Sequence, residues 1–190
     1  MKKNLFFKEE LGYFKTERIK KDAILLIDEL PEYFFSVPAS STGKYHPNYA
    51  LGDGGLVRHT KAAMRIANEL LNVNTSITSF NDVEKDLILL SLLIHDGFKH
   101  GVKKSKYTVF EHPNIIADKV LQMSDVLSLS KEENAIVRSA LMSHMGEWNT
   151  NSYSETILKK PTNRFDKFVH MCDFLASRKF IEIDFGGIYE

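Results

Sequence analysis

The chain has little of several features that mark particular classes of protein. One cysteine, Cys172, cannot form an internal disulfide, so the sequence does not predict a disulfide-stabilised secreted scaffold. The longest strongly apolar run, Leu87 to Ile94, is far shorter than a membrane-spanning helix. The apolar residues near the N-terminus stop at Lys8, which is too early for the core of a signal peptide. We therefore expect a soluble, cytoplasmic protein without a membrane partner.

The sequence also has no net charge. Its 25 basic and 25 acidic residues cancel, which argues against a surface that coats long polyanions. Internal repeats, low-complexity tracts and linkers rich in proline and glycine are missing as well. Because 43% of the 190 residues are hydrophobic, as in ordinary globular proteins, we expect a single domain over residues 1–190.

Helical periodicity runs along most of the chain. It predicts an N-terminal helix at about residues 14–30 and five further helices at about 56–71, 82–96, 113–123, 131–144 and 162–179. Asn81 and Ser130 begin capping-box patterns, and Gly97 and Gly146 follow predicted helix ends, where a left-handed residue is expected. The only plausible strand is short, at 180–183. The predicted fold class is therefore all-α.

Several histidines lie on the apolar faces of these helices. The helix of residues 82–96 is apolar on nearly every side, which predicts burial, and it ends in His95 and Asp96. His59 and His144 share apolar faces with neighbours on their own helices. A single such histidine is most often a hydrogen-bonded core residue, but three helices that each direct one inward indicate a common centre. A buried carboxylate is costly unless it is paired or binds a metal.

The last predicted helix adds a further carboxylate. His170 and Asp173 are three residues apart and so share a face. Asp166 lies on the same edge, where we expect it to be solvated, and we also expect His100 to face solvent. His112 precedes a proline at the start of a helix, which suits either a helix start or a ligand position.

The ordered set of these residues resembles a known family. The segments that carry the resemblance are 54–60, 93–97, 111–113, 143–146 and 170–178. Together they resemble the HD-domain superfamily of metal-dependent phosphohydrolases over about residues 38–179. Within it, the chain is most similar to the HD catalytic domain of bacterial 3′-to-5′ exoribonucleases, which share the Pro38-Ala39 segment and a histidine at the position of His170.

Those exoribonucleases carry an OB-fold domain, which binds single strands, before the HD domain. About 37 residues precede the motif region here, too few for such a domain. We therefore expect a nucleotide or a short oligonucleotide as substrate rather than processive degradation of RNA.

The resemblance implies an HD-type helical bundle with a metal site in its core. It implies one ion held by His59, His95, Asp96 and Asp173, and a second ion held by His112 and His144 with Asp96 as the bridge. Nitrogen and carboxylate donors suit Mn, Fe, Co, Ni or Zn as divalent ions. A hydroxide shared by the two ions would attack phosphorus, and His170 would support the ligands from behind.

Phosphoryl transfer also needs positive charge on the phosphate oxygens. Lys99 follows Asp96 by three residues and is the first candidate for both a catalytic and a substrate-binding role. Arg58, Arg178 and Lys103 are further candidates for substrate binding, although Lys103 and its neighbouring lysines also fit a solvated loop.

Three aromatic rings near the motifs have open roles. His46 is a candidate catalytic residue that could line the pocket or donate a proton to the leaving oxygen. Trp148 and Tyr153 follow the His144 motif and either stack on a base or are ordinary aromatic residues.

Two other functions remain open. Some members of the same superfamily are di-iron oxygenases that act on small molecules, and this is the main alternative to a phosphohydrolase. A catalytically silent binding module is the weaker alternative, because no ligand position is substituted. Metal identity, the number of bound ions, the exact substrate and the oligomeric state stay open.

Overall fold

Helices form nearly all of the regular structure in the computed structural model, which describes residues 2–40, 42–44, 46–73, 79–181, 183 and 185. The α-helices are α1 (Glu17–Glu29), α2 (Gly55–Asn72), α3 (Asp82–Ile94), α4 (His112–Gln122), α5 (Lys131–Ser143) and α6 (Arg164–Ala176). Four short 3₁₀ helices are η1 (Lys3–Phe7), η2 (Glu10–Gly12), η3 (Glu32–Phe35) and η4 (Asn48–Ala50).

The prediction of an all-α fold is confirmed. Across the described residues there is no strand, only an isolated antiparallel bridge between Asn151 and Ser154. The strand expected at 180–183 is not formed by Phe180, Ile181 or Ile183, while its fourth residue, Glu182, lies outside the described residues. No helix in the described part is long and apolar enough to cross a membrane.

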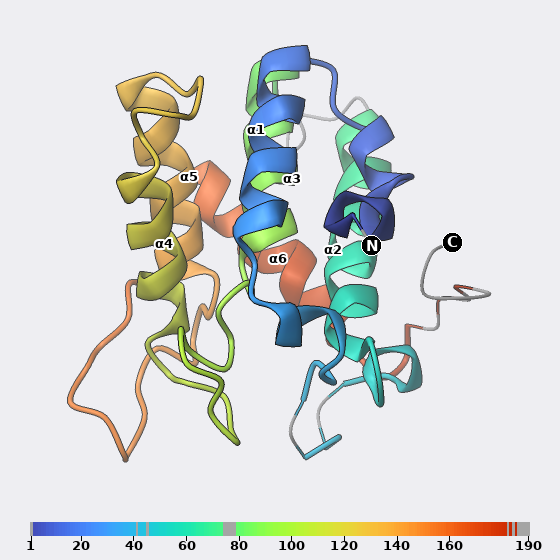
Figure 1. The fold of residues 1–190 in the computed structure, drawn as a ribbon, viewed down its shortest axis with the longest axis vertical. Coiled ribbons are helices and arrows are strands. Elements are labelled where there is room, and N and C mark those ends of the chain that lie inside the picture. The colour runs from blue at the N-terminus through green and yellow to red at the C-terminus, as the bar shows by residue number, and fades with distance from the viewer. Residues whose placement is uncertain are drawn as a thin grey trace.

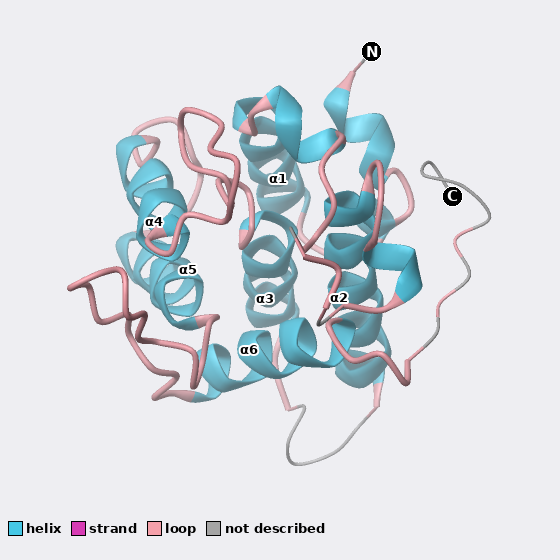
Figure 2. Cartoon of the chain, turned by 90° about the horizontal axis from the view of Figure 1, so that it is seen from below, coloured by secondary structure: helices cyan, strands magenta, loops and turns pink. Residues whose placement is uncertain are grey.

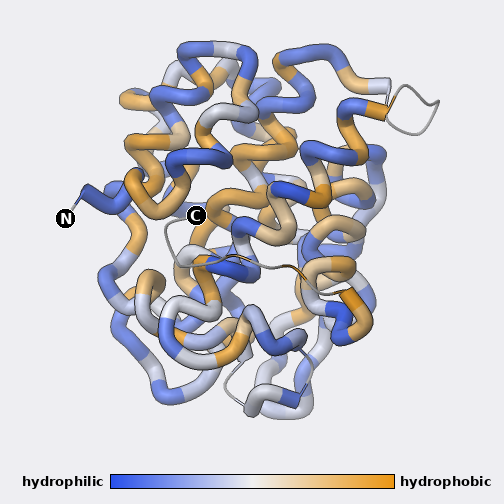
Figure 3. Tube along the Cα trace, turned by 90° about the vertical axis from the view of Figure 1, so that its right-hand side faces the viewer, coloured by the Kyte–Doolittle hydropathy of each residue, from blue (hydrophilic) through white to orange (hydrophobic). Residues whose placement is uncertain are grey.

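Helix α3 lies at the centre of the bundle. It contacts α1, α2, α5 and α6, and Figure 1 shows these helices around it. Every residue from Asp86 to Ile94 is buried, as its apolar sequence predicts. The hydropathy colouring of Figure 3 shows hydrophobic and hydrophilic stretches alternating along the helices, as expected for elements that bury one face.

The up-and-down course of the chain brings several helix ends together. Helices α2 and α4 begin, and α3 and α5 end, at the end of the bundle that faces the viewer in Figure 2. Helix α6 crosses this end and contacts α2, α3 and α5. A residue at the start of one helix and a residue at the finish of the next therefore become neighbours. The predicted ligands occupy these positions.

The local signals at the helix ends are mostly confirmed. Asn81 and Ser130 both form complete capping boxes, and Gly146 has a left-handed backbone with φ of 59°. The expectation for Gly97 is wrong, because its φ is not positive. A Cβ at Gly97 would lie 2.5 Å from a methyl carbon of Leu30, so close packing rather than handedness accounts for this glycine.

Buried carboxylates also fix the helices relative to their connections. Asp86 of α3 accepts the backbone N–H groups of Lys15 and Thr16 at 2.9 and 2.6 Å, just before α1. Asp22 of α1 accepts the backbone N–H of Ser128 at 3.0 Å and its hydroxyl at 2.7 Å. These bonds hold α1 against α3 and against the α4–α5 connection.

Candidate metal centre

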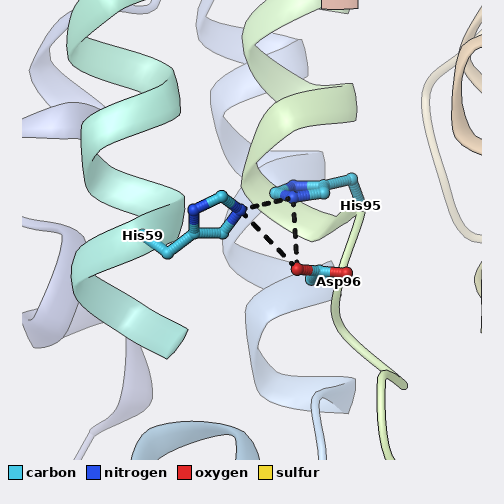
Figure 4. Close-up of side chains that lie close together, drawn as sticks. All are labelled: His59, His95 and Asp96. Carbon is cyan, nitrogen blue, oxygen red and sulfur yellow. Dashed lines mark hydrogen bonds and ion pairs between the residues drawn. The ribbon is translucent and has the colours of Figure 1, made fainter. Parts of the chain in front are cut away.

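Asp96, two residues past the end of the buried α3, directs its two carboxylate oxygens toward different pairs of histidines. Its Oδ2 lies 3.7 Å from Nε2 of His59 and 3.5 Å from Nε2 of His95, the group drawn in Figure 4. Its Oδ1 lies 3.1 Å from Nε2 of His112 and 3.7 Å from Nε2 of His144. One carboxylate therefore lies between two groups that each have the composition of a metal site.

Asp173 of α6 completes the first group. Its Oδ1 lies 2.9 Å from Nε2 of His59 and 3.4 Å from Nε2 of His95. The structure thus brings together all six residues predicted as metal ligands: His59, His95, Asp96, His112, His144 and Asp173.

Backbone hydrogen bonds determine how three of these histidines are protonated. In each, Nδ1 lies 2.7 Å from the carbonyl oxygen three residues earlier: His95 bonds Leu92, His112 bonds Val109 and His144 bonds Leu141. A carbonyl oxygen can only accept, so Nδ1 carries the hydrogen in each ring. In the neutral ring, the Nε2 atom then presents a lone pair to the centre, which is the usual arrangement of metal-binding histidines.

The packing of these lone pairs fits a bound cation. The Nε2 atoms of His59 and His95 lie 3.4 Å apart, and those of His112 and His144 lie 3.2 Å apart. In neutral rings, Nε2 of His112 and Nε2 of His144 are both acceptors, and two acceptors at this distance repel unless a proton or a cation lies between them. Nitrogen donors combined with carboxylate oxygens suit divalent transition metals. The donor set therefore fits the predicted ions.

The charges at the centre also favour a bound cation. Burial alone would raise the pKa of Asp96, but the ammonium of Lys99 and the ring of His95 hold it well below its usual range. Burial alone would likewise lower the pKa of His95, but Asp96 and Asp173 raise it to about 10. Without a metal, a proton on His95 supplies the positive charge that the two carboxylates require.

A cavity of about 620 Å³ opens over this centre. Asp96, His112, His144 and Asp173 reach its surface, while His59 and His95 are not among the lining residues. The remaining lining residues are Ala39, Ser40, Thr42, His46, Lys99, Thr108, Met145, Trp148, His170, Phe174, Ser177 and Arg178. A ligand in the cavity would therefore meet both carboxylates, the histidines of the second group, and several cationic and aromatic side chains.

Comparison with known proteins gives distant relatives. No protein-family model matches the chain, and no solved structure matches it. It is similar to the 3′-5′ exoribonuclease YhaM of Listeria monocytogenes, with 23% identity over 85% of this chain and 49% of the relative. The protein of the same name from Listeria innocua is 22% identical over the same shares.

This similarity confirms the predicted resemblance to bacterial 3′-to-5′ exoribonucleases. The chain spans about half the length of the curated relatives it matches.

The structure brings some of the other predicted site residues to the cavity and leaves others outside it. Lys99 and Arg178 line the cavity, and Lys99 Nζ lies 2.6 Å from Asp96 Oδ2. Arg58 does not line it, because its guanidinium donates to the backbone carbonyls of the loop before α2, those of Tyr49, Leu51 and Asp53. Lys103 is exposed and also lies outside the cavity lining.

His46 and His170 both reach the cavity. The centroids of the His46 and His59 rings are 5.1 Å apart, and burial, with His59 and Lys99, lowers the pKa of His46 to about 3. A neutral ring has no extra proton to give at pH 7, so this pKa does not favour His46 as the proton donor. His170 Nδ1 donates to the backbone carbonyl of His144 at 2.7 Å, so the ring contacts the segment of a candidate ligand rather than the metal position itself.

Two expectations about solvated residues are wrong. His100 is buried, because its Nδ1 bonds the Ser105 carbonyl at 2.9 Å and its ring packs against Tyr33. Asp166 is fully buried and accepts a hydrogen bond from Ser139 at 2.7 Å while pairing with Lys159 at 3.0 Å. Contacts from other segments bury both side chains.

Sequence reasoning assigned no role to Phe174, which lines the cavity next to Asp173. Its position directly after a candidate ligand was the available signal. The part of the wall formed by Ser40 and Thr42 was also missed. An irregular segment has no periodicity that would indicate which of its side chains point into a cavity.

Proposed function

We propose that the chain is a single HD-type domain that acts as a metal-dependent phosphohydrolase on a nucleotide or a short nucleic acid. One observation carries the proposal: the two oxygens of Asp96 face two histidine groups whose lone pairs converge below an open cavity. The distant similarity to exoribonucleases supports a hydrolase of nucleic acids at the family level. The full set of proposed ligands is His59, His95, Asp96, His112, His144 and Asp173.

In this proposal two divalent ions would lower the pKa of a bound water and neutralise the phosphoryl group. The chain's own residues position the metal ligands and the substrate. The backbone carbonyls orient the histidines, and Asp96 fixes the spacing of the two groups. Lys99 and Arg178 face the cavity, where their charges would hold the phosphate oxygens.

Metal analysis and a substrate screen test the proposal directly. We expect two transition-metal ions per chain and metal-dependent hydrolysis of bis-p-nitrophenyl phosphate, followed by activity on nucleotides, cyclic nucleotides or short RNA and DNA. A sample that binds no ions under ligand-preserving conditions would contradict the proposal. Oxygen-dependent turnover of an iron-loaded, coloured sample, without phosphoester hydrolysis, would support the di-iron oxygenase instead.

Changing Lys99 to alanine is expected to raise KM for phosphate substrates by about tenfold, which is the loss of one charge-assisted hydrogen bond. Metal content should stay at the wild-type value, because Lys99 carries no lone pair when protonated. The exposed Lys167 of α6 offers a control of equal charge, and Lys167→Ala should leave KM unchanged. If the Lys99→Ala protein loses metal instead, the role of Lys99 is to stabilise the metal centre and not to bind the substrate.

A further inference from the structure

One wall of the cavity is an aromatic shelf, formed by Trp148, Phe174 and Arg178. The indole of Trp148 stacks on the Phe174 ring, with centroids 5.8 Å apart and planes 17° from parallel. The guanidinium carbon of Arg178 lies 4.1 Å from the centroid of the same Phe174 ring. All three side chains line the cavity above the metal centre.

Trp148 packs against neighbouring rings and is still partly exposed. The His170 ring contacts it at 6.4 Å between centroids and is itself fixed by its bond to the His144 carbonyl. Gly146 allows this close approach, since a Cβ there would lie 2.1 Å from the His170 ring. Despite these contacts, Trp148 is 53% exposed. A large ring that packs against other rings and is still solvent-accessible offers a surface on which a flat ligand can stack.

The aromatic shelf adjoins the position proposed for the phosphate. Phe174 directly follows Asp173, and Trp148 follows His144 by four residues, so the shelf is built from the same two segments as the centre. A phosphate near Asp96 and Lys99 leaves the rest of its molecule in the same cavity, beside a flat apolar ring. A nucleobase has a π-face that can stack over the whole of such a ring, which a ribose lacks.

We propose that the cavity-facing side of Trp148 stacks with the base of the nucleotide whose phosphate lies over the metal centre. This inference rests on the proposed function and names its ligand class: a nucleotide, or the terminal nucleotide of a single strand, rather than a phosphoester without a base. Because every base has a π-face, the shelf binds with little sequence preference. Phe174 supports the indole by stacking on it, and Arg178 packs on Phe174, where its charge remains available to the phosphate.

The chain has a single tryptophan, so its fluorescence reports on Trp148 alone. We would titrate the metal-loaded protein with adenosine 5′-monophosphate and with ribose 5-phosphate, excite where adenine does not absorb, and read before measurable turnover. The proposal predicts saturable quenching by the nucleotide and little change with ribose 5-phosphate. Tight nucleotide binding by calorimetry without any change in tryptophan fluorescence would overturn it.

Variants separate stacking from a merely structural role. By calorimetry, Trp148→Ala is expected to weaken nucleotide binding by about 5- to 100-fold and to leave ribose 5-phosphate binding unchanged. Trp148→Phe should restore most of the difference. The control is Tyr153→Ala, which removes a 96% exposed aromatic from the same connection outside the cavity lining and should have no effect.

The possible outcomes separate base stacking by Trp148 from the proposed phosphohydrolase function. Equal weakening of both ligands by Trp148→Ala would overturn base stacking, while hydrolysis of bis-p-nitrophenyl phosphate would still support a phosphohydrolase. If neither the nucleotide nor ribose 5-phosphate binds, base stacking is overturned. The proposed phosphohydrolase function is overturned as well only if the substrate screen also shows no hydrolysis.

Discussion

Replacing Asp96 by asparagine is expected to lower phosphodiester hydrolysis by on the order of 10³- to 10⁴-fold. The amide keeps the shape of the side chain but loses the charge that faces both histidine groups, at 3.5 Å from His95 and 3.1 Å from His112. Metal analysis of the same sample should find fewer than two ions per chain. Loss of activity and loss of metal should therefore appear together.

Asp22 provides the matched control for this substitution. Asp22 and Asp96 are both 2% exposed, but Asp22 bonds Ser128 at the α4–α5 connection and not the histidine groups. Asp22→Asn should lower thermal stability without changing the number of bound ions. An Asp96→Asn protein that keeps two ions and full activity would rule out the bridging role of this carboxylate.

Much of this centre can be predicted from the sequence, because its residues lie at helix ends. An apolar helix that finishes in His95 and Asp96 must bring both to the border of the core. Alternating helix directions then place His112, at the start of α4, and His144, at the finish of α5, at the same end of the bundle. Periodicity predicts that these helices direct histidines inward, whereas the six-ligand set, including His112, follows only from the resemblance, and distances follow from neither.

Residues whose environment is set by segments outside their own helix could not be predicted. Asp166 looks like a polar helix edge until Ser139 and Lys159 cover it, and no local pattern encodes that contact. Arg58 precedes a ligand but turns to the carbonyls of the loop before α2. In both cases hydrogen bonds to segments outside the residue's own helix decide which way the side chain points, and helical spacing carries no information about such bonds.

Removing bound metal is expected to lower the unfolding temperature by roughly 8–16 °C. The estimate follows from about 4 kcal/mol of linkage when free metal exceeds its Kd by a thousandfold, and from 2–4 °C per kcal/mol for a chain of this size. The physical cause is that a cation relieves the 3.2 Å contact between Nε2 of His112 and Nε2 of His144, and replaces the proton on His95 as the positive charge beside Asp96 and Asp173. Calorimetric scans of metal-loaded and chelator-treated protein measure the difference, and equal unfolding temperatures would contradict it.

The Asp96→Asn variant and the number of protons released on metal binding show whether the stabilisation arises at this centre. Metal should stabilise Asp96→Asn much less than Asp22→Asn, because only the former lacks the bridging charge.

In the metal-free protein, Asp96 and Asp173 raise the pKa of His95 to about 10 against the effect of burial, so His95 is protonated at neutral pH. A metal must displace that proton, so binding should release protons and weaken as the pH falls. Titration calorimetry in buffers of different ionisation enthalpy measures this release. Binding without proton release would place the ion away from His95.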